Sequence, residues 1–394
     1  MSATDRLSRA TAGSPAPLAV VDLDVFDTNA ADLLRRAAGT PVRVATKSVR
    51  VRSLVGRALR AGFTGVMAYS LDEALWLVGT GVRDVLVGYP TVDRDALARW
   101  AADPASRREI TLMVDDVAQV DRVRAALDAA PADGADGALC LDVDSSLRLG
   151  LGPWRAHLGT RRSPLRTPAQ VADLAAAVEA VDGLHVRGLM FYEAQVAGLP
   201  DTSPAVRTVK RLSIRDVERR RRAVLAAVRS AVGRDVELVN AGGTGSLESS
   251  AAGTGVTEVT AGSGLFVPAT FDRYRSFEAR PAAYFGLDVV RSPGQGWATA
   301  FGGGYVASGP AGPSRLPRLV TPGWALTRRE GAGEVQTPMR RRRGGRDLRV
   351  GDRVWFRHAK AGELMERFAT VHLVRGDEVV EEVPTYRGEG RAFG

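Results

Sequence analysis

Residues 42–62 read VRVATKSVRVRSLVGRALRAG, a short β-branched run that leads directly into apolar residues at helical spacing. The same strand–helix pattern recurs as TGVMAYS before LDEALWLVGTG, RDVLVGYP before DRDALARWAAD, and EITLMVDD before VAQVDRVRAALDAA. About eight such repeats follow one another, which is the number that a closed (β/α)₈ barrel requires. Most of these strands are apolar on both faces, as parallel strands covered by helices are. The pattern therefore predicts an α/β fold built on a TIM-like (β/α)₈ barrel.

The pattern changes after residue 277. Short strand patterns such as GLDVVRSP, ATAFGGGYVASG and RVWFRHA then alternate with turns, without a long helix. We expect a smaller, mostly antiparallel β domain over residues 278–394. Residues 1–277 would form the barrel domain, in which LAVVDLDVFDTNAADLLRRA supplies an entry strand and helix ahead of the barrel proper.

The composition describes a globular chain of 394 residues that is 45% hydrophobic. Its single cysteine, Cys140, excludes an internal disulfide and fits a reducing compartment. The first residues lack the apolar run of a signal peptide, and no stretch approaches the roughly 20 apolar residues of a membrane span. We expect a cytoplasmic protein without a membrane partner.

The net charge of +9 and the pI near 10.2 raise the question of nucleic-acid binding. The positive residues gather at Lys210–Arg211, Arg219–Arg222 and Arg340–Arg343. The first two clusters lie on a helical pattern over residues 207–232 that carries no aromatic side chains for stacking on bases. A solvated helix face explains them more simply, so no nucleic-acid partner is expected.

Lysine is rare in this chain. Of the 54 lysines and arginines, only Lys47, Lys210 and Lys360 are lysines, which leaves 51 arginines. An amine can lose its proton or condense with a carbonyl, whereas a guanidinium does neither. Lys47 ends the first barrel strand, where catalytic residues of such barrels gather. Chance use of the few remaining lysine codons is the alternative.

Two glycine-rich turns follow the last two barrel strands, NAGGTGS at 240–246 and AGSG at 261–264. Phosphate sites of (β/α)₈ barrels are commonly built there, because glycines let backbone N–H groups approach an oxyanion. Tight turns that hold no ligand are the alternative. A phosphate site opposite an isolated lysine suggests pyridoxal 5′-phosphate as the cofactor.

The motifs PVRVATKS, DVDSSLRLG, GLMFYEAQ, NAGGTGS and AGSGLFVPATFD occur in the order of fold-type III pyridoxal phosphate enzymes, whose N-terminal barrel is alanine-racemase-like. RVWFRHAKAGELMERF resembles the D-threonine aldolase and D-serine dehydratase branch more closely than alanine racemase. The resemblance implies a lyase that cleaves or dehydrates a D-3-hydroxy amino acid, and a homodimer. An amino-acid racemase and a non-catalytic pyridoxal phosphate protein remain alternatives.

The resemblance also implies roles for single residues. Lys47 would be the Schiff-base lysine and the catalytic base. The phosphate would be held by Asn240, Gly242, Gly243, Thr244, Gly262 and Ser263. Tyr192 would lie near the cofactor ring or phosphate, with a place in the core as its alternative. Arg148 would lie by the ring or its phenolic oxygen, with a salt bridge to Asp142 or Asp144 as its alternative.

One motif departs from the branch it resembles. There, a histidine followed two positions later by cysteine or aspartate binds a divalent metal, but this chain has His358-Ala359-Lys360. An ammonium group cannot ligate a metal. His358 remains a candidate metal ligand and catalytic residue, although Glu363 and His372 lack the spacing to complete its site. Lys360 could place a charge or a second base beside the substrate, or be an ordinary surface residue. We expect a metal-free site or one of altered ligation.

Overall fold

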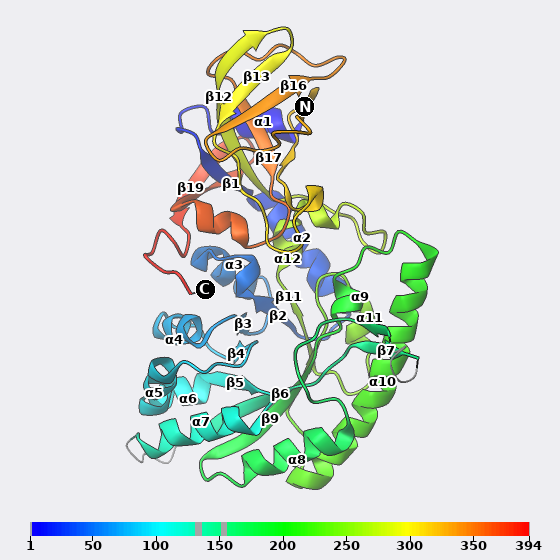
Figure 1. Cartoon of the computed structure of the whole chain (residues 1–394). Coiled ribbons are helices and arrows are strands. Elements are labelled where there is room, and N and C mark those ends of the chain that lie inside the picture. The colour runs from blue at the N-terminus through cyan, green and yellow to red at the C-terminus, as the bar shows by residue number, and fades with distance from the viewer. Residues whose placement is uncertain (1, 131–135, 151–155, 394) are drawn as a thin grey trace.

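The computed structural model describes residues 2–130, 136–150 and 156–393. Eight strands, all in parallel register with their neighbours, close into a barrel (Figure 1). These strands are β2 (Val42–Ala45), β3 (Val66–Ala68), β4 (Val85–Val87), β5 (Ile110–Val114), β6 (Gly137–Asp142), β9 (Leu184–Phe191), β10 (Leu238–Ala241) and β11 (Glu258–Ala261). The predicted barrel is confirmed.

Helices surround the barrel and cover the outer faces of its strands (Figure 1). They are α2 (Leu23–Arg36), α3 (Arg52–Arg60), α4 (Leu71–Gly79), α5 (Arg94–Ala102), α6 (Pro104–Glu109), α7 (Val117–Asp128), α8 (Pro168–Glu179), α9 (Ala194–Ala197), α10 (Pro204–Val232), α11 (Leu247–Ala251) and α12 (Ser263–Phe266). The helix α10 spans the predicted basic helix. Several of its arginines pair with acids of the same helix, as Arg220 does with Asp216 at 2.9 Å and Arg222 with Glu218 at 3.2 Å.

The barrel interior is filled with side chains. Leu86, Met113, Cys140, Met190 and Leu238 form a cluster of buried apolar groups that closes the centre of the barrel. A packed interior leaves the open space at the carboxyl ends of the strands, which is where such barrels bind ligands.

The second domain is built on a nine-stranded sheet that is antiparallel except for one strand pair. Its strands are β1 (Leu18–Asp22), β12 (Ala283–Gly294), β13 (Trp297–Phe301), β14 (Arg318–Leu319), β15 (Trp324–Leu326), β16 (Gln336–Arg341), β17 (Arg353–Arg357), β18 (Thr370–Arg375) and β19 (Glu378–Pro384). The mostly antiparallel second domain is therefore confirmed. The strand β1 lies inside this sheet, between β12 and β18, so the entry strand assigned to the first domain forms its hydrogen bonds in the second. The division at residue 277 stays a prediction.

Short elements complete the chain. They are the helix α1 (Ala3–Ala10), the hairpin of β7 (Leu147–Leu149) and β8 (Ala156–Leu158), and the 3₁₀ turns Thr46–Ser48, Ala269–Phe271, Pro313–Arg315 and Glu363–Arg367. No helix among the described residues is both long and apolar enough to cross a bilayer.

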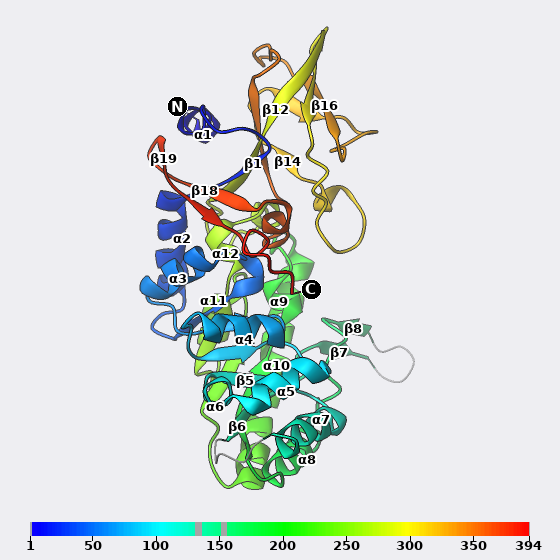
Figure 2. The ribbon, with the colours of Figure 1, turned by 90° about the vertical axis from the view of Figure 1, so that its left-hand side faces the viewer.

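The C-terminal residues fasten the second domain to the barrel (Figure 2). Tyr386 and Phe393 pack against Trp76 of α4, with ring centroids 4.9 and 5.5 Å away. The Tyr386 backbone N–H donates to the carbonyl oxygen of Arg50 at 2.9 Å. The second domain is therefore held over the mouth of the barrel that contains Lys47.

Candidate active site

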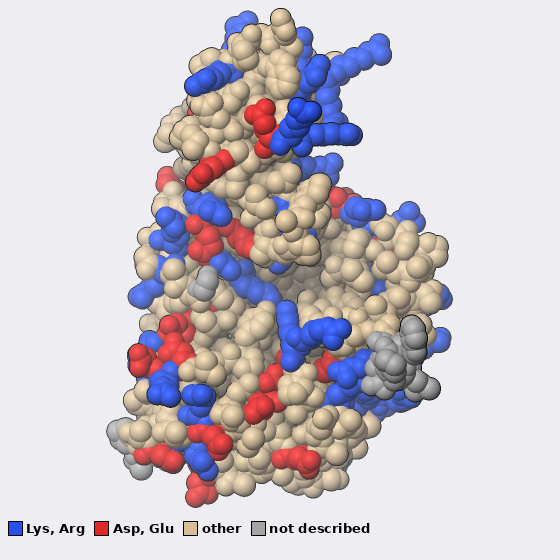
Figure 3. Space-filling view, in the orientation of Figure 1, with Lys and Arg blue, Asp and Glu red and all other residues tan. Residues whose placement is uncertain are grey.

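A cavity of about 270 Å³ lies at the carboxyl ends of the barrel strands, where the second domain meets the barrel. The space-filling view shows a hollow between the two domains with Lys and Arg side chains at its edge (Figure 3). Most of the residues predicted for the site line this one cavity: Lys47, Tyr192, Asn240, Gly242, Gly243, Thr244, Gly262, Ser263 and Lys360. Arg148 and His358 do not line it.

Lys47 occupies the 3₁₀ turn that follows strand β2. Its amine donates to the Tyr89 hydroxyl at 2.5 Å. Burial alone would raise the pKa of the Tyr89 phenol, but the charge and hydrogen bond of Lys47, helped by Arg162, lower that pKa below its usual range. The two side chains therefore form a coupled acid–base pair on one wall of the cavity.

The first glycine turn is fixed by a hydrogen bond to the buried acid Glu193. The Gly242 N–H donates to the Glu193 carboxylate at 2.9 Å, and burial raises the pKa of Glu193. A Cβ on Gly242 would stand 2.8 Å from the Ser250 side chain, so the turn closes only without a side chain there. The Gly243 N–H donates to the Ser246 hydroxyl at 3.2 Å, so the N–H groups of both glycines are used within the turn and its support.

The second glycine turn forms polar contacts with the first glycine turn and with the 3₁₀ turn that carries Lys47. The Gly264 N–H donates to the Thr244 hydroxyl at 3.0 Å. The hydroxyls of Ser48 and Ser263 lie 3.2 Å apart. Two glycine turns joined in this way form a cradle of backbone and hydroxyl groups. Its chemistry suits a phosphate.

Asn240 lines the cavity, but its amide group is used inside the barrel. Its Nδ2 atom donates to Glu258 at 2.6 Å and to Thr260 at 2.7 Å. Both N–H bonds of the side chain are thus engaged, and only its carbonyl oxygen remains. An oxygen acceptor repels phosphate, so this arrangement does not favour the predicted phosphate role of Asn240.

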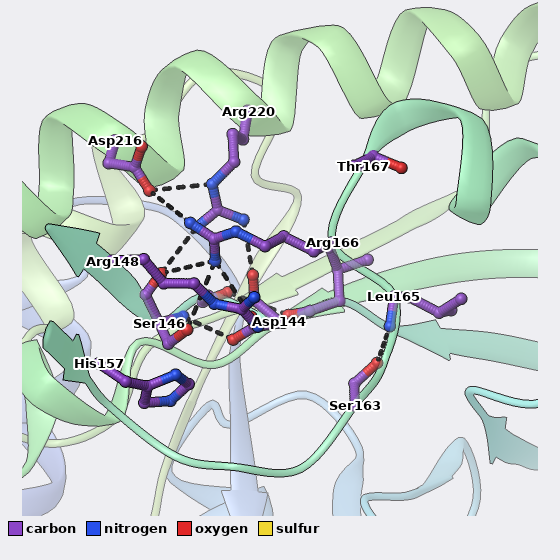
Figure 4. A network of polar contacts seen from close by, with 12 residues as sticks. Asp144, Ser146, Arg148, His157, Ser163, Leu165, Arg166, Thr167, Asp216 and Arg220 are labelled. Atoms are coloured by element: carbon purple, nitrogen blue, oxygen red, sulfur yellow. Dashed lines mark hydrogen bonds and ion pairs between the residues drawn. The ribbon is translucent and has the colours of Figure 1, made fainter. Parts of the chain in front are cut away.

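Arg148 is not where the resemblance implies. It lies on the β7–β8 hairpin and donates to Asp144 at 2.7 Å, which is the ion pair named as its alternative (Figure 4). Arg166 donates to the same carboxylate at 3.0 Å and Arg220 to the Asp144 carbonyl oxygen at 2.6 Å. The Asp144 carboxylate is buried, and a buried charge is stable only when it is paired. This explains why the Arg148 side chain turns toward Asp144.

Among the cavity residues that the sequence analysis did not assign to the site are two arginines and a tyrosine, Arg162, Arg315 and Tyr89. Arg162 lies over the rings of Tyr89 and Tyr192, 5.7 and 5.6 Å from their centroids. Tyr89 could have been found, because it follows the third predicted strand as Lys47 follows the first. Arg315 comes from a loop of the second domain, where no periodic pattern marks a position as facing the barrel.

The described residues around His358 do not suit a divalent metal. His358 is buried, its two ring nitrogens have no hydrogen-bond partner among the described residues, and burial with the nearby Arg357 lowers its pKa to about 3. Glu363 binds the Ser308 amide, and His372 lies beside Glu382 in the sheet. Among described residues no three His, Cys, Asp or Glu side chains converge as ligands.

Residues 21–269 match the family model described as the N-terminal domain of alanine racemase. The chain belongs to this family. The match agrees with the order of motifs and confirms the resemblance to fold-type III pyridoxal phosphate enzymes. It covers the barrel and both glycine turns.

Individual relatives are more distant. The 3-hydroxy-D-aspartate aldolase of Paracoccus denitrificans (strain Pd 1222) is 24% identical over 275 residues, which is 67% of this chain and 63% of that protein. The structure of D-threonine aldolase from Filomicrobium marinum has a TM-score of 0.80 at 22% identity, covering 95% of this chain and 96% of that one. D-threo-3-hydroxyaspartate dehydratase from Delftia sp. HT23 has a TM-score of 0.72 at 20% identity, with 94% and 97% covered. The two structures show a shared two-domain fold.

Proposed function

We propose that the protein is a pyridoxal phosphate-dependent lyase that acts on a D-3-hydroxy amino acid. The observation that carries this proposal is the placement of the Lys47 amine and two linked glycine turns in one cavity. The names of the relatives, an aldolase and a dehydratase of 3-hydroxy amino acids among them, support the substrate class.

The described residues fit the cofactor. Thr244 and Ser263 would hold the phosphate through their backbone N–H and hydroxyl groups, beside Gly243, and Lys47 would bond the aldehyde carbon. Tyr192 would lie along the ring. When bound, pyridoxal phosphate supplies a conjugated ring that accepts the electron pair released at the substrate Cα.

The protein's own contribution is to move protons and to orient the substrate. Once released from the cofactor, the Lys47 amine can take a proton from the substrate, and the Tyr89 phenol 2.5 Å away can exchange that proton with it. A phenol with a lowered pKa is better suited to this exchange than an ordinary tyrosine. Arg162 would hold a carboxylate of the substrate by its fixed charge.

The test is turnover of a panel of D-3-hydroxy amino acids by the protein loaded with pyridoxal phosphate. Aldol cleavage yields glycine and an aldehyde, whereas dehydration yields a 2-oxo acid and ammonia, so the products separate the two reactions. We expect Lys47→Ala to abolish either reaction. Because the donors around His358 do not suit a metal, we expect treatment with EDTA to leave the rate unchanged.

Other outcomes would identify the alternatives. Interconversion of D- and L-amino acids without cleavage would make the protein a racemase. Bound pyridoxal phosphate without turnover of any substrate would make it a non-catalytic binding protein. A rate that falls with EDTA and returns with a divalent metal would contradict the metal-free site.

A further inference from the structure

The cavity carries an unusual excess of positive charge. Four cationic side chains line it, Lys47, Arg162, Arg315 and Lys360, and no Asp or Glu is among the described lining residues. Elsewhere arginines pair with acids, as Arg57 does with Asp27 at 2.5 Å. A cluster of like charges is unfavourable unless an anion joins it.

Two of these cations meet on one short turn of the second domain. The Lys360 amine donates to the Ser308 hydroxyl at 2.8 Å. The Arg315 Nε atom lies 2.7 Å from the point where a Cβ on Gly309 would stand. Ser308 and Gly309 are consecutive, so the two charges lie against neighbouring residues and face the same cavity.

The turn is fixed in this position by other groups. The Ser308 N–H donates to both carboxylate oxygens of Glu363 at 3.0 Å, so this acid holds the backbone of the turn. The Arg315 N–H and carbonyl oxygen bond to Gly312 and Ala307, each at 2.9 Å. The Arg315 Nε atom is nevertheless buried without a hydrogen-bond partner among the described residues. Because the Nε atom is covered by protein, an anion in the cavity would be bound by the terminal nitrogens of the Arg315 guanidinium.

The cofactor phosphate is itself an anion in this cavity, and in the proposed function the two glycine turns of the barrel hold it. Two of the four cations come instead from the second domain. In the proposed function Lys47 bonds the cofactor, and Arg162, on the barrel side, would hold the α-carboxylate of the substrate. Arg315 and Lys360 then remain on the opposite wall. We propose that these two residues form a subsite for a second carboxylate, so that the substrate is a D-3-hydroxy amino acid with an acidic side chain.

This inference rests on the proposed function and adds the side chain of the substrate. A forked guanidinium beside an ammonium group matches the two oxygens of a carboxylate. A neutral side chain in the same place would leave both cations without a partner, which disfavours binding of neutral substrates.

The experiment compares D-aspartate with D-asparagine, which has nearly the same shape but lacks the side-chain charge. Neither has the 3-hydroxyl group, so neither can undergo the proposed cleavage or dehydration. Their dissociation constants are measured with the loaded protein from the change in cofactor absorption after rapid mixing. We expect the wild-type protein to bind D-aspartate at least about 10-fold more tightly than D-asparagine.

Two variants and one control locate the effect. Arg315→Gln and Lys360→Met should each weaken D-aspartate binding by about 10-fold or more while D-asparagine binding changes less than about 2-fold. Arg328→Gln removes an exposed arginine of the second domain that does not line the cavity, and should change neither constant. Urea unfolding of each variant checks that it is folded, and either variant alone suffices for the test.

The outcomes separate this inference from the proposed function. If the variants weaken both ligands equally, Arg315 and Lys360 bind the α-carboxylate and the inference is wrong, although the enzyme assignment stands. If Arg328→Gln weakens D-aspartate as much, the effect is one of overall charge and the subsite is also refuted. If the wild-type protein takes up no pyridoxal phosphate, the proposed function fails first, and the inference with it.

Discussion

Lys47 and Tyr89 are close enough to exchange a proton, and this contact can be tested by removing one oxygen atom. Tyr89→Phe should retain the cofactor but lower the rate of turnover by about 10- to 100-fold, because Lys47 loses its hydrogen-bond partner. The wild-type rate should also change with pH below 10, where the phenol with its lowered pKa loses its proton, and this limb should vanish in the variant. A pH profile of turnover measures both effects.

A matched control is available in Tyr69. Its hydroxyl is buried without a hydrogen-bond partner among the described residues, and it does not line the cavity. Tyr69→Phe should leave the rate and the pH profile nearly unchanged. An equal loss in both variants would mean that Tyr89 acts through packing instead of proton exchange.

Glu73 is a fully buried acid at the start of α4, and burial raises its pKa from 4.5 to about 7. The folded state therefore keeps a proton that the unfolded state has lost, so stability falls as the pH rises from 4.5 to about 7 and stays low above it. The shift corresponds to about 3 kcal/mol. Glu73→Gln should raise the free energy of unfolding by up to that amount at pH 8 and by little at pH 4.5.

Urea unfolding at the two pH values measures this difference. The Tyr69 N–H that donates to Glu73 at 2.7 Å can donate equally to a glutamine oxygen, so the substitution preserves that contact. The same gain at both pH values would show that the glutamine improves packing and that the carboxyl group carries no penalty.

Single residues of the site differed in how far they could be predicted. Lys47 stood out because its chemistry is rare in an arginine-rich chain and because it ends a strand. Arg148 was misplaced because the resemblance fixes an order of motifs, whereas the buried Asp144 decides which way the side chain turns. Arg315 faces the cavity through a loop contact, and sequence patterns do not encode contacts between distant segments.

The loop after β17 approaches the Lys47 strand more closely than a side chain allows. A Cβ on Gly362, whose φ is 91°, would stand 1.8 Å from the Lys47 carbonyl oxygen. Gly362→Ala must therefore displace the loop that carries Lys360. We expect a loss of about 1–3 kcal/mol in the free energy of unfolding and weaker retention of the cofactor.

Gly351→Ala is the matched control for this element. Gly351 has nearly the same φ of 93°, but no atom lies within 4 Å of a Cβ placed there. It should suffer the backbone strain of about 1 kcal/mol without loss of cofactor. Equal effects on cofactor retention in the two variants would refute the role of the close approach.

Strands that a continuous apolar run identifies were predicted correctly. The partners of a strand that pairs with segments far away in the sequence were not. The strands β2, β4 and β5 are buried along their whole length, as their continuous apolar runs indicated. The strand β1 has an equally apolar run, yet it pairs with β12 and β18 at the other end of the chain. Its apolar pattern indicates burial but does not identify its partners.

At the scale of the whole molecule, the two domains share structural elements at both chain ends. The N-terminal strand β1 lies within the sheet of the second domain, and the C-terminal Phe393 packs on α4 of the barrel. We therefore expect one cooperative unfolding transition in calorimetry, with circular dichroism and tryptophan fluorescence changing together. Two separate transitions would show that the domains are stable independently.

Chemical reduction can show whether Lys47 carries the cofactor. The protein is loaded with pyridoxal phosphate, reduced with borohydride, digested, and analysed by mass spectrometry. We expect a cofactor-modified peptide containing Lys47, and no such peptide from Lys47→Ala. Modification at Lys210 or Lys360 in place of Lys47, or no modified peptide at all, would contradict this expectation.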